Sequence, residues 1–215
     1  MVASLDGATT ANGVSGALGG DADRRVFRAV RGVGDVIMAG AGTMRAESYG
    51  PVTLADEVIA ARRDAGRDTT PPRLVAVTSR LDLDPTDAIF SGDAPAIVIT
   101  TAAVDPGERA RFEAITDVIV AGDGPGIDVR RGLGALADLG VDVVVLEGGP
   151  TLNGAFHAVD AIDELCMTVD PTIVGGDSHR VVNRGPSTGR DHRFRLDSLL
   201  IEDDVLCGRW VRDRT

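Results

Sequence analysis

Residues 142–154, with the sequence DVVVLEGGPTLNG, constrain the fold of this chain more than any other stretch. A run of valine and leucine ends at Glu147, two glycines follow, and Pro150 opens a segment with a helical pattern. Proline is well tolerated at the first helical position, since its missing N–H would have no partner there. The order predicts a strand, a tight turn and a helix N-terminus. The unpaired amides of such a helix suit an anion such as phosphate, but an ordinary turn of an α/β protein explains the pattern equally well.

The same order of strand, glycine turn and helix occurs earlier, at residues 35–46. There the apolar run DVIMA leads into Gly40-Ala41-Gly42-Thr43, and Thr43 is a candidate for the helix N-cap. Further apolar runs of strand length alternate with segments of helical pattern along the first 160 residues. The strands are expected at residues 1–5, 73–78, 96–100 and 117–121, and the helices at residues 21–31, 55–65 and 128–139.

The chain after residue 163 is mainly β-structure by its pattern. Residues 164–169 and 172–174 are strand-like, and residues 194–201 and 205–211 form an expected antiparallel pair across a short acidic turn. Alternating strands and helices followed by strands predict an α/β fold with one doubly wound sheet. We expect a mostly parallel central sheet flanked by helices, with antiparallel C-terminal strands, in a single domain spanning residues 1–215.

Composition excludes several classes of function. The net charge of −11 argues against nucleic acid or an anionic membrane as the main partner. All 22 basic residues are arginine, so Schiff-base catalysis by lysine and a P-loop lysine are both excluded. The two cysteines and three histidines match no metal-binding spacing, so no metal is expected. Since no apolar run approaches about 18 residues, we expect a cytoplasmic enzyme.

Three predicted strand ends should meet at one edge of a parallel sheet: residues 40–43, Ser79-Arg80 and residues 147–153. The two glycine turns could hold a pyrophosphate. Arg80 offers a guanidinium that can bind a ribose 2′-phosphate through two oxygens, although a solvated surface charge is the alternative. The G-x-G-x-x-G fingerprint of dinucleotide-binding folds is missing from the sequence.

Three acidic residues, Asp6, Glu47 and Glu147, are expected near this edge of the sheet. A carboxylate at a strand end can accept a hydrogen bond from the N–H edge of a pyrimidine or pterin ring, or it can move a proton. Asp6 could equally form a turn with Gly7, and Glu47 could be an ordinary solvated helix residue.

Five motifs occur in a fixed order along the chain: Ser4-Leu5-Asp6-Gly7, Gly13-x-Ser15, Arg31-x-x-x-Asp35-Val36-Ile37-x-x-Gly40-x-x-Thr43, Glu147-Gly148-Gly149-Pro150-Thr151-Leu152-Asn153 and Asp170-Pro171-Thr172-Ile173-Val174-Gly175-Gly176. In combination they resemble the pyrimidine reductase of riboflavin biosynthesis, the reductase half of the bifunctional deaminase–reductase. The likeness spans roughly residues 1–176, and the zinc deaminase half has no counterpart in this chain. The resemblance implies a dihydrofolate reductase-like fold, NADPH as hydride donor and a homodimer.

The resemblance also implies roles for individual residues. The substrate would be a 5-amino-6-ribosylamino-pyrimidinedione 5′-phosphate, whose ribosyl group is opened and reduced to ribityl. Asp6, Ser15, Arg31 and Glu147 would face this substrate. Asp6 and Glu147 would orient the ring in catalysis, with the proton coming from one of them or from water. The dinucleotide would be held by residues of the three strand ends: Gly40, Gly42, Thr43, Glu47, Ser79, Arg80, Gly148, Gly149, Pro150, Thr151, Leu152, Asn153 and Gly154.

Two departures from the family pattern concern the substrate. Where the family has Asp-Asp-Pro-x-Leu followed by an arginine for the substrate phosphate, residues 47–54 are ESYGPVTL, and the arginine is missing. Ala17 stands where the family often has an aromatic residue. Two other hypotheses therefore stay open, namely a reductase of a pterin such as dihydrofolate and an NADP-binding protein without catalysis.

Overall fold

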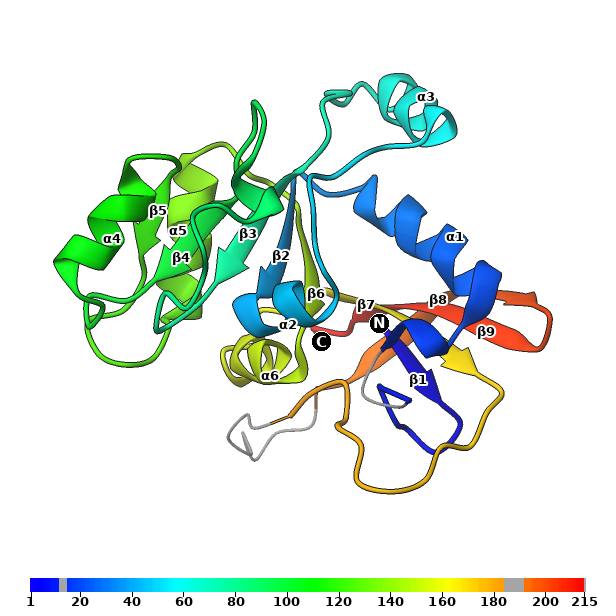
Figure 1. Ribbon diagram of the computed structural model, residues 1–215. Coiled ribbons are helices and arrows are strands. Elements are labelled where there is room, and N and C mark those ends of the chain that lie inside the picture. Colours follow the sequence, from blue (N-terminus) through cyan, green and yellow to red (C-terminus); the bar gives the residue numbers. More distant parts are fainter. Residues whose placement is uncertain (12–14, 184–191, 215) are drawn as a thin grey trace. The chain divides into compact units, whose positions relative to one another are not determined.

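The computed structural model describes residues 1–11, 15–183 and 192–214 and has an α/β architecture (Figure 1). Its contacts divide the chain into two compact units. One unit is Arg31–Glu147, and the other combines Met1–Val30 with Gly148–Thr215. Within the described ranges, no helix is long and apolar enough to cross a membrane.

The unit of residues 31–147 is built on a five-stranded sheet with the strand order β5-β4-β3-β2-β6. The pairs β2–β3, β3–β4 and β4–β5 are parallel, as predicted. The amide of Asp35 donates to the carbonyl of Val143 at 2.9 Å, so β2 and β6 begin side by side. The strands are β2 (Val36–Gly40), β3 (Arg73–Val77), β4 (Ile97–Thr100), β5 (Val118–Val120) and β6 (Val144–Gly148), which ends at the first residue of the other unit.

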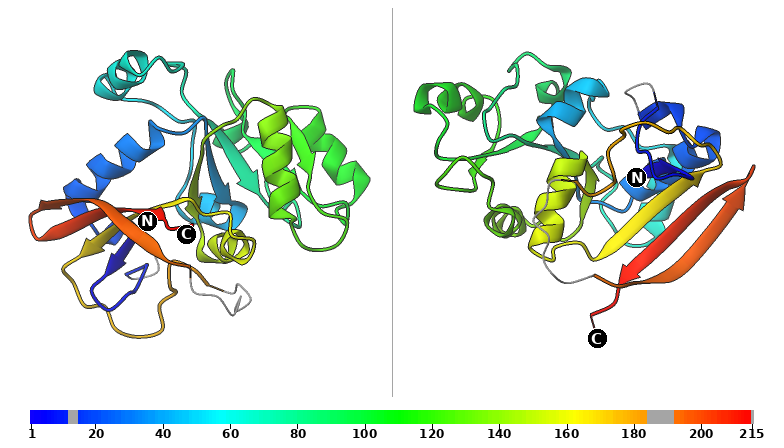
Figure 2. Two further views of the ribbon diagram at one scale, coloured as in Figure 1. Left: turned by 180° about the vertical axis from the view of Figure 1, so that it is seen from behind. Right: turned by 90° about the horizontal axis from the view of Figure 1, so that it is seen from below.

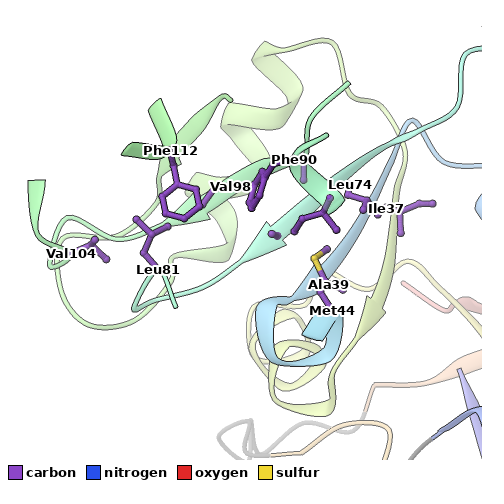
Figure 3. Packing of buried hydrophobic residues seen from close by; sticks show 12 residues of the cluster. Ile37, Ala39, Met44, Leu74, Leu81, Phe90, Val98, Val104 and Phe112 are labelled. Atoms are coloured by element: carbon purple, nitrogen blue, oxygen red, sulfur yellow. The ribbon is translucent and has the colours of Figure 1, made fainter. Parts of the chain in front are cut away.

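Apolar residues run almost without a break along β2, β3 and β4, because helices cover both faces of the sheet. On one face Leu74 and Val98 join Phe90 and Phe112 in a single buried cluster (Figure 3). The rings of Phe90 and Phe112 meet edge to face, with centroids 5.5 Å apart. The helices of this unit are α2 (Ala41–Ala46), α3 (Asp56–Asp64), α4 (Pro106–Glu113) and α5 (Val129–Asp138), with a 3-10 turn at Ala88–Phe90.

The other unit contains a four-stranded mixed sheet with the order β1-β7-β9-β8 (Figure 2). β1 (Val2–Ser4) is parallel to β7 (Glu164–Asp170), whereas β9 (Val205–Arg212) is antiparallel to both β7 and β8 (Phe194–Glu202). The predicted antiparallel C-terminal pair is thus confirmed. The helices are α1 (Gly20–Arg31), which packs Ala22 and Val26 against β9, and α6 (Pro150–Ala158).

The structure corrects the predicted sheet arrangement. The C-terminal strands do not extend the parallel sheet, because β7 pairs with β1 on one side and with β9 on the other. Residues 172–174 are not a strand. Their backbone groups have other partners, since the amide of Val174 donates to the Asp6 carboxylate and the carbonyl of Thr172 accepts from the amide of Leu5.

Two helix starts also differ from expectation. Thr43 is not an N-cap, because α2 begins directly at the end of β2 and Gly40 is its N-cap, without a side-chain hydrogen bond. Helix α4 is absent from the sequence prediction, although Asp105 and Pro106 mark its start. The Asp105 carboxylate accepts from the amides of residues 107 and 108, and Pro106 is the first helical residue.

Candidate functional site

A buried ion pair occupies the carboxyl end of β6. Arg31 donates to both carboxylate oxygens of Glu147, from Nε to Oε1 and from Nη2 to Oε2, each at 2.7 Å. The hydroxyl of Tyr49 adds a third donor, 2.6 Å from Oε2. The side chain of Glu147 is only 4% exposed and that of Arg31 is 23% exposed. The structure therefore brings together two predicted substrate residues, Arg31 and Glu147, and adds Tyr49, which no sequence motif indicates.

The electrostatics of this ion pair follow from its burial. Burial opposes the charge of Arg31, but the hydrogen bonds and charge of Glu147 outweigh that effect and raise the pKa of Arg31. Burial, and then the charge of Glu147, raise the pKa of Tyr49 well above its ordinary value of 10.0. The Arg31 guanidinium also lies 5.3 Å from the centroid of the Tyr49 ring. At neutral pH both Arg31 and Tyr49 are therefore hydrogen-bond donors to Glu147.

The backbone after Arg31 is fixed by a second, buried arginine. Arg62 of α3 is 5% exposed and donates to the carbonyls of Gly32 at 2.8 Å and Gly34 at 3.0 Å. Position 34 requires glycine, because an added Cβ would lie 2.8 Å from Cγ2 of Val145 in β6. This contact ties the segment that follows Arg31 to the strand that carries Glu147.

A polar cluster lies at the carboxyl end of β3. Asp82 accepts from the Thr78 hydroxyl at 2.7 Å, from Arg45 at 3.0 Å and from Arg80 at 3.5 Å. Leu81 has a φ of 54°, a strained conformation for a bulky residue, and its side chain is buried in the core. The side chain of Arg80 is 82% exposed. The guanidinium groups of Arg45 and Arg80 share the single carboxylate of Asp82. A net positive charge therefore remains, and it suits a phosphate.

The glycine turn and the start of α6 belong to the unit of residues 1–30 and 148–215. Pro150 is the first helical residue of α6, as predicted, and Gly149 is its N-cap. Gly148 has a φ of 96°, and the peptide bond between Gly148 and Gly149 is cis. Asn153 is 4% exposed and donates from its side-chain amide to the carbonyl of Val181 at 2.7 Å.

This turn suits a dinucleotide. The Oδ1 of Asn153 has no hydrogen-bond partner among the described residues, so it is available to accept from a ligand hydroxyl such as that of a ribose. No side chain caps the start of α6, and its first amides can therefore bind an anionic diphosphate. Asn153 Oδ1 and the uncapped start of α6 both fit NADPH, the cofactor that the family resemblance implies.

Asp6 is held by hydrogen bonds from its own unit. Its carboxylate accepts from the Ser4 hydroxyl, from the amide of Gly175 at 2.7 Å and from the amide of Val174 at 3.2 Å. These bonds, that of Ser4 first, lower the pKa of Asp6 from 3.8 to about 2. Gly7 follows with a φ of 85°, and its amide donates to the carbonyl of Ser4, so Asp6 lies in a tight turn. Asp6 is ionised at neutral pH and acts as an acceptor.

Replacing Asp6 with asparagine is expected to lower stability in a pH-dependent way. Because folding lowers the pKa of Asp6, its carboxylate stabilises the folded state above pH 3.8, and this contribution is lost as the pH falls towards about 2. The difference in unfolding free energy between wild type and Asp6→Asn should therefore be constant near neutral pH and shrink below pH 3.8. Urea denaturation at a series of pH values measures it, and a pH-independent difference would contradict the assignment.

The other predicted cofactor residues are placed as follows. A Cβ at Gly42, inside α2, would meet nothing within 4 Å, so that surface is open. Glu47 is the C-cap of α2, and Ser79 follows β3 after one residue. Ser15 begins a short 3-10 helix, but its side chain lies outside the described structure, as does Gly13. Among the described side chains, no group of three His, Cys, Asp or Glu residues is arranged to hold a metal ion.

The sequence of this chain matches a known protein family. Residues 1–204 match the family described as RibD C-terminal domain. A protein of Methanothermobacter thermautotrophicus named 2,5-diamino-6-ribosylamino-4(3H)-pyrimidinone 5′-phosphate reductase is 29% identical over 183 residues, which cover 84% of this chain and 80% of that protein. The riboflavin biosynthesis protein RibD of Bacillus amyloliquefaciens is 27% identical over 175 residues, which cover 81% of this chain but only 45% of that protein.

A solved structure supports the fold directly. The crystal structure of a pyrimidine reductase-like protein from Corynebacterium diphtheriae has a TM-score of 0.84 to this chain at 26% identity, covering 100% of this chain and 90% of that one. The fold class expected from the resemblance is therefore confirmed.

Proposed function

The chain belongs to the RibD C-terminal domain family, and from this membership we propose that it is an NADPH-dependent reductase of riboflavin biosynthesis that acts on a ribosylaminopyrimidine 5′-phosphate. The observation that carries the proposal is the buried carboxylate of Glu147, fixed by Arg31 and Tyr49 at the carboxyl end of a sheet strand. Open α/β sheets collect their ligands at this edge. A carboxylate there suits the N–H edge of a pyrimidine ring.

The proposed reaction converts the ribosylamino group of the substrate to a ribitylamino group. When the ribose ring opens, C1′ and the attached nitrogen form an imine. Bound NADPH would supply the hydride that adds to C1′, and the nitrogen takes up a proton. The substrate is either the 5-amino-pyrimidinedione expected from the resemblance or the 2,5-diamino-pyrimidinone named for the archaeal relatives.

The chain's own residues would bind and orient this substrate. We assign substrate contacts to Asp6, Ser15, Arg31 and Glu147, and the orientation of the ring in catalysis to Asp6 and Glu147. With a pKa of about 2, Asp6 has no proton to donate at neutral pH. Because Glu147 already accepts three hydrogen bonds, we assign the proton to water. Most of the rate acceleration would then come from holding the two rings in place.

We propose that the cofactor contacts the two glycine turns, at residues 40–43 and 148–149, and the residues that follow β3. The uncapped start of α6 and the orphaned Oδ1 of Asn153 fit a diphosphate and a ribose. The contacting residues would be Gly40, Gly42, Thr43, Glu47, Ser79, Arg80, Gly148, Gly149, Pro150, Thr151, Leu152, Asn153 and Gly154. The proposal includes a homodimer in the cytoplasm, with each chain working as one domain.

Replacing Arg80 with alanine is expected to weaken NADPH binding about tenfold and to leave NADH binding unchanged, because only NADPH carries the 2′-phosphate. Arg45 shares Asp82 with Arg80, and its alanine variant should show the same selectivity to a smaller extent. Fluorescence titration with both nucleotides measures the two affinities, and Arg111→Ala, an exposed arginine on α4, is the control. Equal weakening of both nucleotides would contradict the role of Arg80.

One observation keeps a second candidate open. Residues 47–54 contain no arginine for a substrate phosphate, and Tyr49 of this segment contacts Glu147 instead. This arrangement favours a ring without a phosphate, such as the pterin of dihydrofolate. Turnover with NADPH on both pyrimidine phosphates and on dihydrofolate separates the candidates. NADPH binding without oxidation in any of the three would indicate a non-catalytic NADP-binding protein.

A further inference from the structure

Tyr49 is the only tyrosine of the chain, and it lies in the segment that departs from the family pattern. The end of helix α2 fixes its backbone. Ser48 has a φ of 51°, the amide of Ser48 donates to the carbonyl of Arg45 at 3.3 Å, and the amide of Tyr49 donates to the carbonyl of Met44 at 2.9 Å. This pair of hydrogen bonds around a left-handed residue is a Schellman motif. The Tyr49 side chain packs against the core cluster that contains Met44, so backbone and ring are both held.

The hydroxyl of Tyr49 makes the two oxygens of Glu147 unequal. A carboxylate has about four acceptor positions, two on each oxygen. Oε2 accepts from Arg31 and from Tyr49, so both of its positions are filled. Oε1 accepts from Arg31 alone among the described residues and keeps one position. A ligand N–H that bonds to Glu147 must therefore approach Oε1.

We propose that Tyr49 is a positioning residue that directs the N–H edge of the substrate ring to Oε1 of Glu147. Without Tyr49, Arg31 would donate one hydrogen bond to each oxygen of the carboxylate, and one acceptor position would stay free on each. Tyr49 removes the position on Oε2, so a single orientation of the ring remains. The ligand class is a planar heterocycle that presents an N–H donor, as pyrimidines and pterins both do. The inference rests on the proposed function, because it concerns the substrate of the same site.

Tyr49→Phe tests the inference, since it removes the hydroxyl and keeps the ring packing. We expect KM for the pyrimidine phosphate to rise about tenfold, because the substrate ring can then bond to either oxygen of a carboxylate that Tyr49 no longer fixes, with kcat changed less than about threefold. The affinity for NADPH should stay unchanged. Val52→Ala is the matched control, because Val52 packs against the same cluster from the same segment. It should lower the melting temperature and leave KM unchanged. An unchanged KM in Tyr49→Phe would overturn the inference.

A second measurement does not depend on the substrate. Because Tyr49 is the only tyrosine, alkaline titration of tyrosinate absorbance reports on this residue alone. In the wild type Tyr49 should ionise only when the protein unfolds, and in Glu147→Gln it should ionise at lower pH, before unfolding seen by circular dichroism. Ionisation of the folded wild type near the ordinary value of about 10 would overturn the inference. If the wild type turns over no pyrimidine, the proposed function is wrong, and this titration still decides whether Tyr49 holds Glu147.

Discussion

Replacing Arg31 with alanine is expected to lower the unfolding free energy by about 3 kcal/mol and to reduce kcat/KM at least a hundredfold. The reason is the burial of Glu147, whose side chain is 4% exposed. Without Arg31 its negative charge stays in the protein interior with only the Tyr49 hydroxyl as donor. Removing one partner of a buried ion pair destabilises a protein by about 3–5 kcal/mol, and the partial exposure of Arg31 places this case at the lower limit.

Urea denaturation of Arg31→Ala beside Arg24→Ala measures this effect. Arg24 pairs with Asp21 on the surface of α1, with side chains 57% and 81% exposed, so its loss should change stability by less than about 1 kcal/mol. Adding Glu147→Gln to Arg31→Ala removes the unpaired charge and should recover part of the stability without recovering activity. If Arg31→Ala were no less stable than Arg24→Ala, the ion pair would not be buried as described.

Arg62→Ala is expected to have an effect of similar size, about 3 kcal/mol, for a different reason. The Arg62 guanidinium is the hydrogen-bond donor to the carbonyls of Gly32, Gly34 and Asp68, and the residue is 5% exposed. A buried carbonyl that loses its donor destabilises the fold by about 1–3 kcal/mol. Since the segment at residues 32–34 follows Arg31 directly, kcat/KM should fall as well, although Arg62 touches no proposed ligand.

The neighbouring Arg63→Ala provides the control, because Arg63 lies on the exposed face of the same helix. It should change stability by less than about 0.5 kcal/mol and leave kcat/KM unchanged. Thermal and urea denaturation of both variants measure the contribution of Arg62 to stability. Steady-state kinetics measure its effect on the placement of Arg31. A large loss of stability in Arg62→Ala with unchanged kcat/KM would show that the 32–34 segment does not position Arg31.

The local features of this fold could be predicted because they rest on neighbouring residues. The strand, glycine turn and proline of residues 144–150 appear in the structure as predicted, and so do β2, β3 and the antiparallel pair β8–β9. In each case the side-chain period and the turn residues are sufficient. The start of α4 could also have been predicted, since Asp105 and Pro106 are both residues that favour a helix start.

The features that could not be predicted depend on contacts between distant residues. Tyr49 and Glu147 are 98 positions apart, and nothing near Tyr49 in sequence indicates an acidic partner. Residues 172–174 have a strand-like composition, but the Asp6 carboxylate takes the amide of Val174, 168 positions away. The assignment of β7 to a separate sheet depends on β1, at the other end of the chain. Tertiary contacts of this kind override local propensity.

Transfer of deuterium from the nicotinamide of deuterated NADPH to the product tests the central claim most directly. The protein is incubated with the labelled cofactor and each of the two pyrimidine phosphates, and the product is analysed by mass spectrometry and NMR. The proposed function predicts one deuterium at C1′ of the ribityl group and one NADPH oxidised for each product formed. Bound NADPH that stays unoxidised with both substrates, or a product without deuterium at C1′, would contradict the account.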